Sequence, residues 1–310
     1  WRAGAVIEDL EFFQFHPTAL KLDGAPSFLI SEALRGEGAV LVDSFGDSPV
    51  DHLEGKDLAS RDQISRALFK AMKKQKVDHM GLDVKSIAVA DKEARFPSIF
   101  QRCREVGLEP LKELIPVAPS AHYWMGGVAT NLKAETNIKG LFAIGEVACT
   151  GLHGANRLAS NSLMECLVFA NQMRNIELNN FKTANIEIKN TSFNQENLRF
   201  SNEQGTQYLT QEIEKLRKLC WREAGVDRAQ KGMFAALTKI KQDYGNLLKE
   251  PLLNLVFSQS KDAINGFDEI ARRDLNLLLD LSNRQMSSSL MFEACLFREE
   301  SRGGHFRDDF

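Results

Sequence analysis

The sequence has few cysteines, and none of them forms a C-x-x-C pair. The five are scattered along the chain and odd in number: Cys103, Cys149, Cys166, Cys220 and Cys295. This pattern excludes a disulfide framework and a cysteine-based zinc site, and it is typical of reduced thiols. We therefore expect a cytoplasmic location.

Long apolar runs and an excess of basic charge are also lacking. No stretch approaches the ~18 uninterrupted apolar residues of a membrane span, and the first residues do not form a secretory signal. A net charge of −3 and a pI near 6.1 offer no general attraction to nucleic acid or to anionic membranes. The sequence thus predicts neither a nucleic-acid partner nor a membrane partner.

The composition is that of an ordinary globular protein, in a chain long enough for two or three packed units. Of the 310 residues, 43% are hydrophobic and 26% are charged, close to the usual values. The chain does not begin with Met. We therefore expect a fragment that begins inside a domain.

The first hundred residues contain expected strands and two expected helices. Residues 1–20 are apolar and aromatic, which predicts strand and turn. Ser60 and Gln63 have the spacing of a capping box, so a helix is expected to begin with Arg61 at its first position. A second helix is expected from about Pro97 to Val106, where a glycine follows and ends it.

A strand, a glycine-bearing loop and a helix follow one another in the middle of the chain. Leu141–Glu146 predicts a short buried strand, and residues 160–173 predict an apolar helix with Met164 and Leu167 in the core. This order is typical of an α/β unit. Residues 176–200 lack periodicity and predict a linker, and the pattern beyond them predicts a C-terminal helical bundle.

Several short loops place a His or an Arg beside Gly, Pro, Ser or Asn. These residues are His16, Arg61, His122, His153 and Arg157. Converging cations indicate an anionic ligand, because Arg binds carboxylates in a bidentate manner and His donates hydrogen bonds to them. No spacing such as H-E-x-x-H occurs, so the sequence predicts no metal site.

Each of these positions also has a purely structural explanation. A single His beside Pro is more often a turn residue than a ligand, and Arg61 and Arg157 could join surface ion pairs. Glu146, after a strand, is usually a solvated carboxylate, and Ser160 is most simply the N-cap of a helix. The residues alone leave both interpretations open.

Six motifs occur in an order that spans nearly all of the chain. They are QFHPT (14–18), SEALRGEG (31–38), RD (61–62), HYWMGG (122–127), GE (145–146) and REESRGGHFR (298–307). Together they resemble the flavoprotein family of succinate dehydrogenase, fumarate reductase and aspartate oxidase. The run TGLHGANRLASNSL (150–163) resembles the aspartate oxidase branch, because the succinate and fumarate enzymes usually have a glycine pair where Ala159 and Ser160 stand.

The resemblance implies an α/β plus α fold, with part of an FAD-binding Rossmann-like domain, an inserted α+β capping domain and a C-terminal helical bundle. The expected segments are the end of the first FAD-binding segment (1–11), the capping or substrate domain (12–120), the second FAD-binding segment (121–176), a linker (177–200) and the helical domain (201–310). No strand is followed by G-x-G-x-x-G, so we expect a fragment that lacks the N-terminal FAD-binding half. Whether FAD binds without that half stays open.

The activity that the resemblance implies is FAD-dependent oxidation of L-aspartate to iminoaspartate by hydride transfer to flavin N5. This is the first step of NAD biosynthesis through quinolinate, and it implies oxygen or fumarate as electron acceptor and a functional link to quinolinate synthase. Two alternatives are a flavoprotein subunit of fumarate reductase or succinate dehydrogenase, and a non-catalytic helical interaction fragment formed by residues 201–310.

The resemblance also assigns roles to single residues. Arg61 resembles the arginine that transfers a proton. The residues expected to bind substrate are His16, Ser31, Glu32, His122 and Arg157, and those expected to bind the cofactor are Glu146, Asn156, Ser160, Ser162 and Leu163. Binding both carboxylates would orient the substrate Cα hydrogen toward the flavin.

Overall fold

The computed structural model describes residues 1–174, 176, 203–253 and 269–310. Within these residues the chain forms two compact units. The first consists of Trp1–Phe169 with Arg302–Phe306, and the second of Ala170–Ser301 with Arg307–Phe310. The linker predicted for residues 176–200 lies, except for Ile176, outside the described residues.

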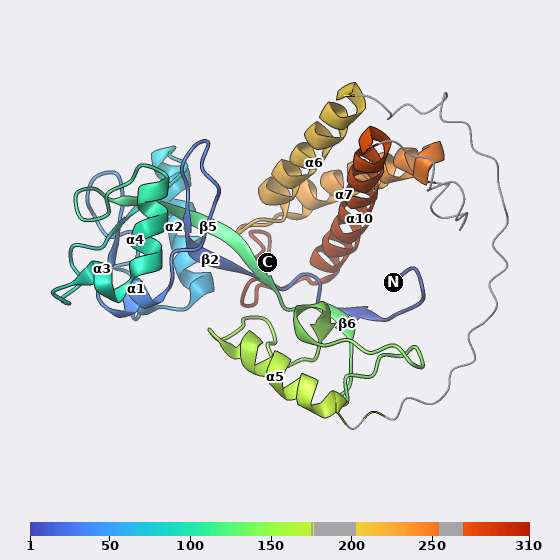
Figure 1. Cartoon of the computed structure of the whole chain (residues 1–310), viewed down its shortest axis with the longest axis horizontal. Helices are drawn as coiled ribbons and strands as arrows, with labels where there is room; N and C mark the ends of the chain where they lie inside the picture. Colours follow the sequence, from blue (N-terminus) through green and yellow to red (C-terminus); the bar gives the residue numbers. More distant parts are fainter. Residues whose placement is uncertain (175, 177–202, 254–268) are drawn as a thin grey trace. The chain divides into compact units, whose positions relative to one another are not determined.

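The first unit contains two sheets (Figure 1). One has the order β2-β5-β4-β3 with antiparallel neighbours, and the other has the order β1-β6-β7, in which β1 pairs antiparallel and β7 parallel with β6. The strands are β1 (Ile7–Glu8), β2 (Phe13–Leu20), β3 (Val40–Val42), β4 (Met80–Asp83), β5 (Ile115–Trp124), β6 (Gly127–Ala129) and β7 (Ala148–Cys149). The strands predicted within residues 1–20 are therefore present.

Short and long helices connect these strands. They are α1 (Ala33–Gly36), the 3-10 helix η1 (Lys56–Leu58), α2 (Arg61–Gln75), α3 (Lys92–Arg95), α4 (Pro97–Glu105), the 3-10 helix η2 (Gly145–Val147) and α5 (Asn161–Met173). Arg61 is the first residue of α2, as predicted. The predicted capping box is wrong, because the Ser60 hydroxyl donates to Asp62 Oδ1 (2.6 Å) instead of accepting from the helix backbone.

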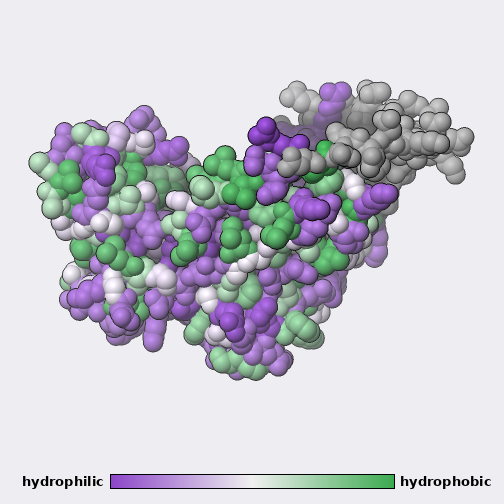
Figure 2. Space-filling model, turned by 90° about the horizontal axis from the view of Figure 1, so that it is seen from below, coloured by the Kyte–Doolittle hydropathy of each residue, from purple (hydrophilic) through white to green (hydrophobic). Residues whose placement is uncertain are grey.

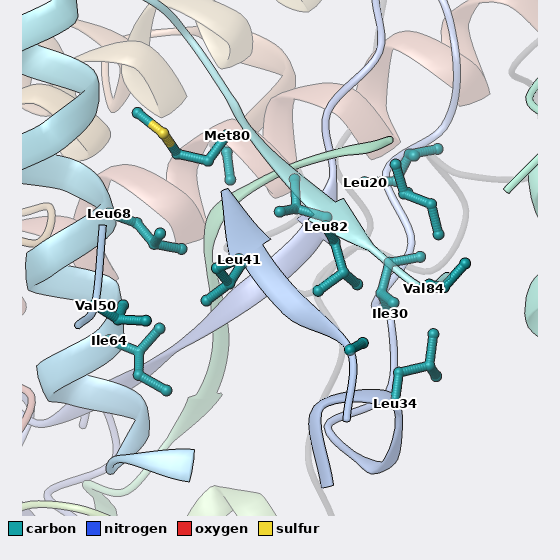
Figure 3. Close-up of a cluster of buried hydrophobic side chains, with 14 of the residues drawn as sticks. Leu20, Ile30, Leu34, Leu41, Val50, Ile64, Leu68, Met80, Leu82 and Val84 are labelled. Carbon is teal, nitrogen blue, oxygen red and sulfur yellow. The ribbon is translucent and has the colours of Figure 1, made fainter. Parts of the chain in front are cut away.

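A hydrophobic core lies between α2, α4 and the strands β3, β4 and β5 (Figure 3). Ile64, Leu68 and Met72 recur at helical spacing on α2, and all three are buried. They share this core with Leu41 and Leu82 of the sheet. Each buried side chain of this size contributes about 1.5–3 kcal/mol, so the helix that begins with Arg61 is firmly anchored.

The middle of the chain departs from its predicted structure in two ways. Leu141–Glu146 is not a buried strand: Phe142 forms an isolated bridge, and Gly145 has a φ of +70°, which is incompatible with a strand. Met164 and Leu167 are not in the core, since they are 58% and 66% exposed. The face of α5 turned inward carries Glu165 and Phe169 instead.

Hydrophobic and hydrophilic side chains are mixed on the surface. Figure 2 shows hydrophobic and hydrophilic residues interspersed over one face. On α5, the exposed apolar side chains are Leu163, Met164, Leu167 and Val168. An apolar helical stripe can thus lie at the surface of a unit, and periodicity alone does not say which face is covered.

The second unit is helical, as predicted. Its described helices are α6 (Glu203–Glu223), α7 (Gln230–Leu247) and α10 (Glu269–Phe297), and all three pack against one another. Their shared core includes Leu209, Leu216, Met233, Ile240 and Leu278. Across the described ranges, no helix combines the length and apolar character needed to cross a membrane.

Candidate active site

Strands β2 and β5 bring His16 and His122 together. The pairing of the two strands is irregular between His16 and Ala19, where Pro17 has no backbone N–H to donate to the ladder. His16 pairs with Ser120, and His122 lies two residues further along β5. The two imidazole rings lie 5.4 Å apart between centroids, edge to face.

Arg61 lies beside these histidines and is held by two side chains. Its Nε and one terminal nitrogen donate to Glu32 Oε2 at 3.0 and 2.7 Å, and its other terminal nitrogen donates to Gln14 Oε1 at 2.9 Å. Only 11% of the Arg61 side chain is exposed. The guanidinium is therefore fixed in position by acceptors from two other segments of the chain: β2 and the turn that precedes α1.

Gln14 also connects Arg61 to the loop that carries Arg157. Its side-chain amide donates to Asn156 Oδ1 (2.9 Å) and to the Arg157 carbonyl (2.6 Å). Asn156 in turn donates to Asp62 Oδ1 (2.8 Å) at the start of α2. One buried amide thus links the Arg61 guanidinium to the backbone of Arg157.

Arg157 is buried but only weakly bonded. Its guanidinium lies over the ring of Tyr123, 4.6 Å from the centroid, and its hydrogen bonds to Leu158 O and Ser162 Oγ are long, at 3.4 and 3.3 Å. Its Nε is buried and has no hydrogen-bond partner among the described residues. A buried donor of this kind is costly unless a ligand accepts from it.

Burial and the positive charge of the site keep both histidines neutral. Burial, followed by the charges of Arg61 and neighbouring cations, lowers the pKa of His16 to about 3 and that of His122 to about 4. His16 Nδ1 accepts from the Thr18 N–H (3.3 Å), so its Nε2 carries the proton and can donate. Burial and Arg61 also lower the pKa of Arg157.

Arg35 and Ser31 lie near Glu32 and contribute differently. Arg35 is 2% exposed, donates to the Asp57 carbonyl (2.5 Å), and has one terminal nitrogen 3.7 Å from Glu32 Oε1. Ser31 is exposed, and its hydroxyl accepts from the Ala33 N–H at the start of α1. The structure therefore brings together His16, His122, Arg61, Arg157 and Glu32, whereas the Ser31 hydroxyl bonds to the backbone of α1 instead.

Sequence reasoning missed Gln14 and Arg35 as residues of this site, although a signal for Gln14 was present. Gln14 stands two residues before His16 on the same strand, so the two side chains share a face of the sheet. Arg35 lies one helical turn after Glu32 in a four-residue helix. Nothing in the local sequence indicates that this arginine is buried.

The assembled groups are suited to a dianion. The charges that act on His16 are those of Arg61, Arg35 and Arg157, and Arg61 and Arg157 also act on His122, so the surroundings of the two histidines are positive. His16 and His122 are neutral and can donate without adding charge. A small molecule with two carboxylates would balance this charge and satisfy the unbonded Arg157 nitrogen.

The residues expected to bind the cofactor lie at η2, in the loop that contains Asn156 and at the start of α5. Glu146 is exposed, and its Oε1 accepts from the Trp124 N–H (3.0 Å). Ser160 has a φ of +67° and precedes the first residue of α5, where helical N–H groups have no intrahelical acceptor. The Leu163 N–H, by contrast, already donates to the Ser160 carbonyl (3.1 Å).

Two protein families match the chain in succession. The FAD binding domain family matches residues 1–163, more than half of the chain, and the C-terminal family of the fumarate reductase flavoprotein matches residues 213–310. The chain belongs to this flavoprotein family. The resemblance inferred from the motifs is confirmed, and FAD is the cofactor of the family.

The relatives of this flavoprotein include several aspartate oxidases. It is 43% identical to the L-aspartate oxidase of Nostoc sp. over its whole length, which corresponds to 55% of that relative, and 42% identical to that of Synechocystis sp., of which it covers 56%. The L-aspartate oxidase of Vibrio cholerae is 36% identical over 100% of this chain and 54% of its own. The chain thus spans about half the length of the curated relatives it matches.

Solved structures confirm the α/β plus α fold. A variant of the E. coli quinol fumarate reductase FrdA is similar with a TM-score of 0.70 and 29% identity, over 98% of this chain and 54% of the other. Sdh1 of Mycobacterium smegmatis in complex with UQ1 has a TM-score of 0.69 and 26% identity, over 100% of this chain and 51% of the other. The predicted fold class is therefore correct.

The residues present fit a flavin. The N–H groups of Asn161 and Leu163 already donate to the Leu158 and Ser160 carbonyls, so the first turn of α5 offers mainly the positive end of a helix, which favours the anionic form of the reduced cofactor. Glu146 offers a carboxylate at an exposed position, where sugar hydroxyls can donate to it. The exposed apolar side chains of α5 provide a surface that a planar ring system can cover.

Proposed function

We propose that the protein to which this chain belongs oxidises L-aspartate to iminoaspartate with FAD as hydride acceptor. The observation that carries this proposal is the buried, weakly bonded guanidinium of Arg157 beside the pair His16 and His122. It supports a site for a small dicarboxylate. The identity to aspartate oxidases over the whole chain supports the choice of aspartate.

In this proposal the substrate is held at both ends. His16 and Glu32 lie toward one end and His122 with Arg157 toward the other, and the neutral histidines donate to the carboxylates. Ser31 is assigned to the first end by family resemblance. When bound, FAD accepts the hydride that leaves the substrate Cα. Binding at two points orients that hydrogen and lowers the entropic cost of the reaction.

We assign Arg61 and Glu32 to accept the proton that the substrate nitrogen loses. Oxidation of an ammonium-bearing Cα to an iminium removes one hydride from carbon and one proton from nitrogen. Arg61 is paired with Glu32 through two hydrogen bonds to the same oxygen, so a proton passed to this pair is stabilised by a carboxylate. Arg35 lies 3.7 Å from the other oxygen of Glu32 and extends the line of polar groups away from the site.

We expect the cofactor to be held by residues of η2, of the loop before α5 and of the start of α5. We assign Glu146 to a sugar hydroxyl, and Ser160 and Ser162 to the ring system at the start of α5. Asn156 is assigned to the cofactor by resemblance, and its side chain is engaged by Gln14 and Asp62. Leu163 keeps its assigned contact only if its N–H leaves the Ser160 carbonyl.

The domain boundaries and the cellular role are part of the same proposal. Residues 12–120 would form the capping domain, 1–11 and 121–176 the FAD-binding segments, and 201–310 the helical domain after a linker. Iminoaspartate is unstable in water, which supports a functional link to quinolinate synthase in NAD biosynthesis. Oxygen or fumarate would reoxidise the flavin, and the odd number of scattered cysteines supports a cytoplasmic location.

A second candidate is a fumarate reductase or succinate dehydrogenase flavoprotein. The similarity to solved fumarate reductase structures favours it. Anaerobic mixing of the FAD-loaded protein with L-aspartate or with succinate, followed by flavin absorbance, separates the two. Bleaching by aspartate supports the oxidase. Bleaching by succinate alone supports the second candidate, and a protein that binds neither flavin nor dicarboxylate would be the non-catalytic interaction fragment.

A further inference from the structure

A buried polar cluster lies directly behind Arg157, and the proposed reaction does not use it. Its centre is Glu165 on the inward face of α5, with a side chain that is 0% exposed. Three donors surround its carboxylate: Thr150 Oγ1 lies 2.5 Å from Oε1, and His153 Nε2 and the Tyr123 hydroxyl lie 2.9 and 3.2 Å from Oε2. The cluster joins the loop before Arg157, strand β5 and α5.

The Tyr123 hydroxyl and the His153 ring both bond to the same oxygen of Glu165. Burial and the charge of Glu165 raise the pKa of Tyr123, so its phenol stays protonated and donates. His153 Nε2 lies 2.9 Å from Glu165 Oε2, and its Nδ1 is buried with no hydrogen-bond partner in the described part of the chain.

The ring of Tyr123 connects this cluster to the proposed substrate site. The Arg157 guanidinium lies over its face at 4.6 Å, and His122 precedes it on β5. Since Arg157 has two long hydrogen bonds and a buried Nε with no partner among the described residues, the face of the Tyr123 ring contributes to holding its guanidinium. The ring can serve as a fixed platform only if its hydroxyl is anchored.

We propose that Glu165 is a positioning residue for dicarboxylate binding: by anchoring the Tyr123 hydroxyl together with His153 and Thr150, it holds the ring on which Arg157 rests. This inference rests on the proposed function, because it assumes that Arg157 binds a carboxylate of the substrate. Glu165 cannot touch the substrate, because its side chain is fully enclosed, so its proposed role in binding acts through Tyr123 and Arg157.

The proposal separates two substitutions at the same position. Glu165→Gln keeps an oxygen for Tyr123 and His153, and its amide can donate to the Thr150 hydroxyl, so the anchor is retained. Glu165→Leu has a similar size but removes the carboxylate from all three donors. We therefore expect Glu165→Gln to bind dicarboxylate within about twofold of wild type, and Glu165→Leu to bind at least about tenfold more weakly, since the loss of one charge-assisted contact has this size.

The test measures the affinity of the FAD-loaded protein for malonate, from the perturbation of flavin absorbance. Malonate carries two carboxylates on one carbon and so cannot be oxidised to an alkene or an imine. Tyr123→Leu, which removes the platform but leaves Glu165 with two donors, provides a second route if Glu165→Leu does not retain FAD. Gln172→Leu, at an exposed position on the same helix, is the matched control.

The outcomes distinguish this inference from the proposed function. Weaker malonate binding in Glu165→Leu or in Tyr123→Leu, with Glu165→Gln and Gln172→Leu unchanged, supports it. Unchanged binding in whichever of the first two variants retains FAD overturns it, and so does a Glu165→Gln variant as weak as Glu165→Leu. If wild type itself binds no malonate, the proposed dicarboxylate site fails instead.

Discussion

Replacement of Gln14 by Leu tests whether the spacing of the two arginines controls the reaction. Gln14 is 1% exposed and makes three hydrogen bonds, one from Arg61 to its oxygen and two from its amide to the loop of Asn156 and Arg157. Leu has a similar volume but can make none of them. The hydrophobic core of the unit does not include this position.

The expected magnitude follows from the bond to Arg61. A hydrogen bond to a charged group contributes about 1.5–3 kcal/mol, and each 1.36 kcal/mol corresponds to about tenfold in rate. If the orientation of Arg61 matters mainly in the transition state, kcat/KM for L-aspartate falls roughly 10- to 150-fold. The two lost bonds to the Arg157 loop add a rise in KM.

Stopped-flow bleaching of the flavin by L-aspartate measures both quantities. The control is Gln63→Leu, the same substitution at an exposed position on α2. A Gln14→Leu variant that retains FAD and bleaches at a rate within about twofold of the control would refute the reasoning. It would show that Arg61 is positioned by Glu32 alone.

Three further predictions follow from single contacts. Glu32→Gln weakens the pairing with Arg61, so the bleaching rate falls at least about tenfold while malonate affinity changes less, which rapid mixing would reveal. The pKa of His16 is near 6.5 in the unfolded state and about 3 in the folded state, so only the unfolded state gains a proton as the pH drops from about 6.5 to about 3. Stability therefore falls through this window, by up to about 1.4 kcal/mol per pH unit. Chemical denaturation of His16→Asn should show a weaker dependence of the free energy of unfolding on pH. Gly304→Ala would place a Cβ 2.5 Å from a β2 carbonyl and destabilise the protein by about 1–3 kcal/mol, whereas Gly36→Ala meets nothing and should shift the denaturation midpoint little.

The sequence predicted the position of single site residues within helices better than the contacts between residues from different strands. Arg61 at the start of α2 could be predicted, because Ile64 and Leu68 repeat at helical spacing behind it. The juxtaposition of His16 and His122 depends on a strand register that includes an irregularity at Pro17. Family resemblance grouped these residues, but only the register explains the contact.

The inward face of α5 shows why the rest could not be predicted. Leu167 and Met164 have the apolar character of core residues but are exposed, whereas Glu165 is charged and fully enclosed. Hydrophobic periodicity ranks positions by transfer free energy and cannot foresee donors supplied by distant segments. The donors Thr150, His153 and Tyr123 that make Glu165 a buried residue are brought to it by the tertiary fold.

The most direct test of the account is the bleaching rate of the FAD-loaded protein with L-aspartate deuterated at Cα, compared with L-aspartate deuterated at Cβ. The proposed reaction breaks the Cα–H bond and leaves both Cβ hydrogens in place. We therefore predict that deuterium at Cα slows bleaching and that deuterium at Cβ leaves it unchanged. Slowing by deuterium at Cβ would indicate desaturation of the carbon chain, as in succinate oxidation, and absence of bleaching by aspartate would contradict the account.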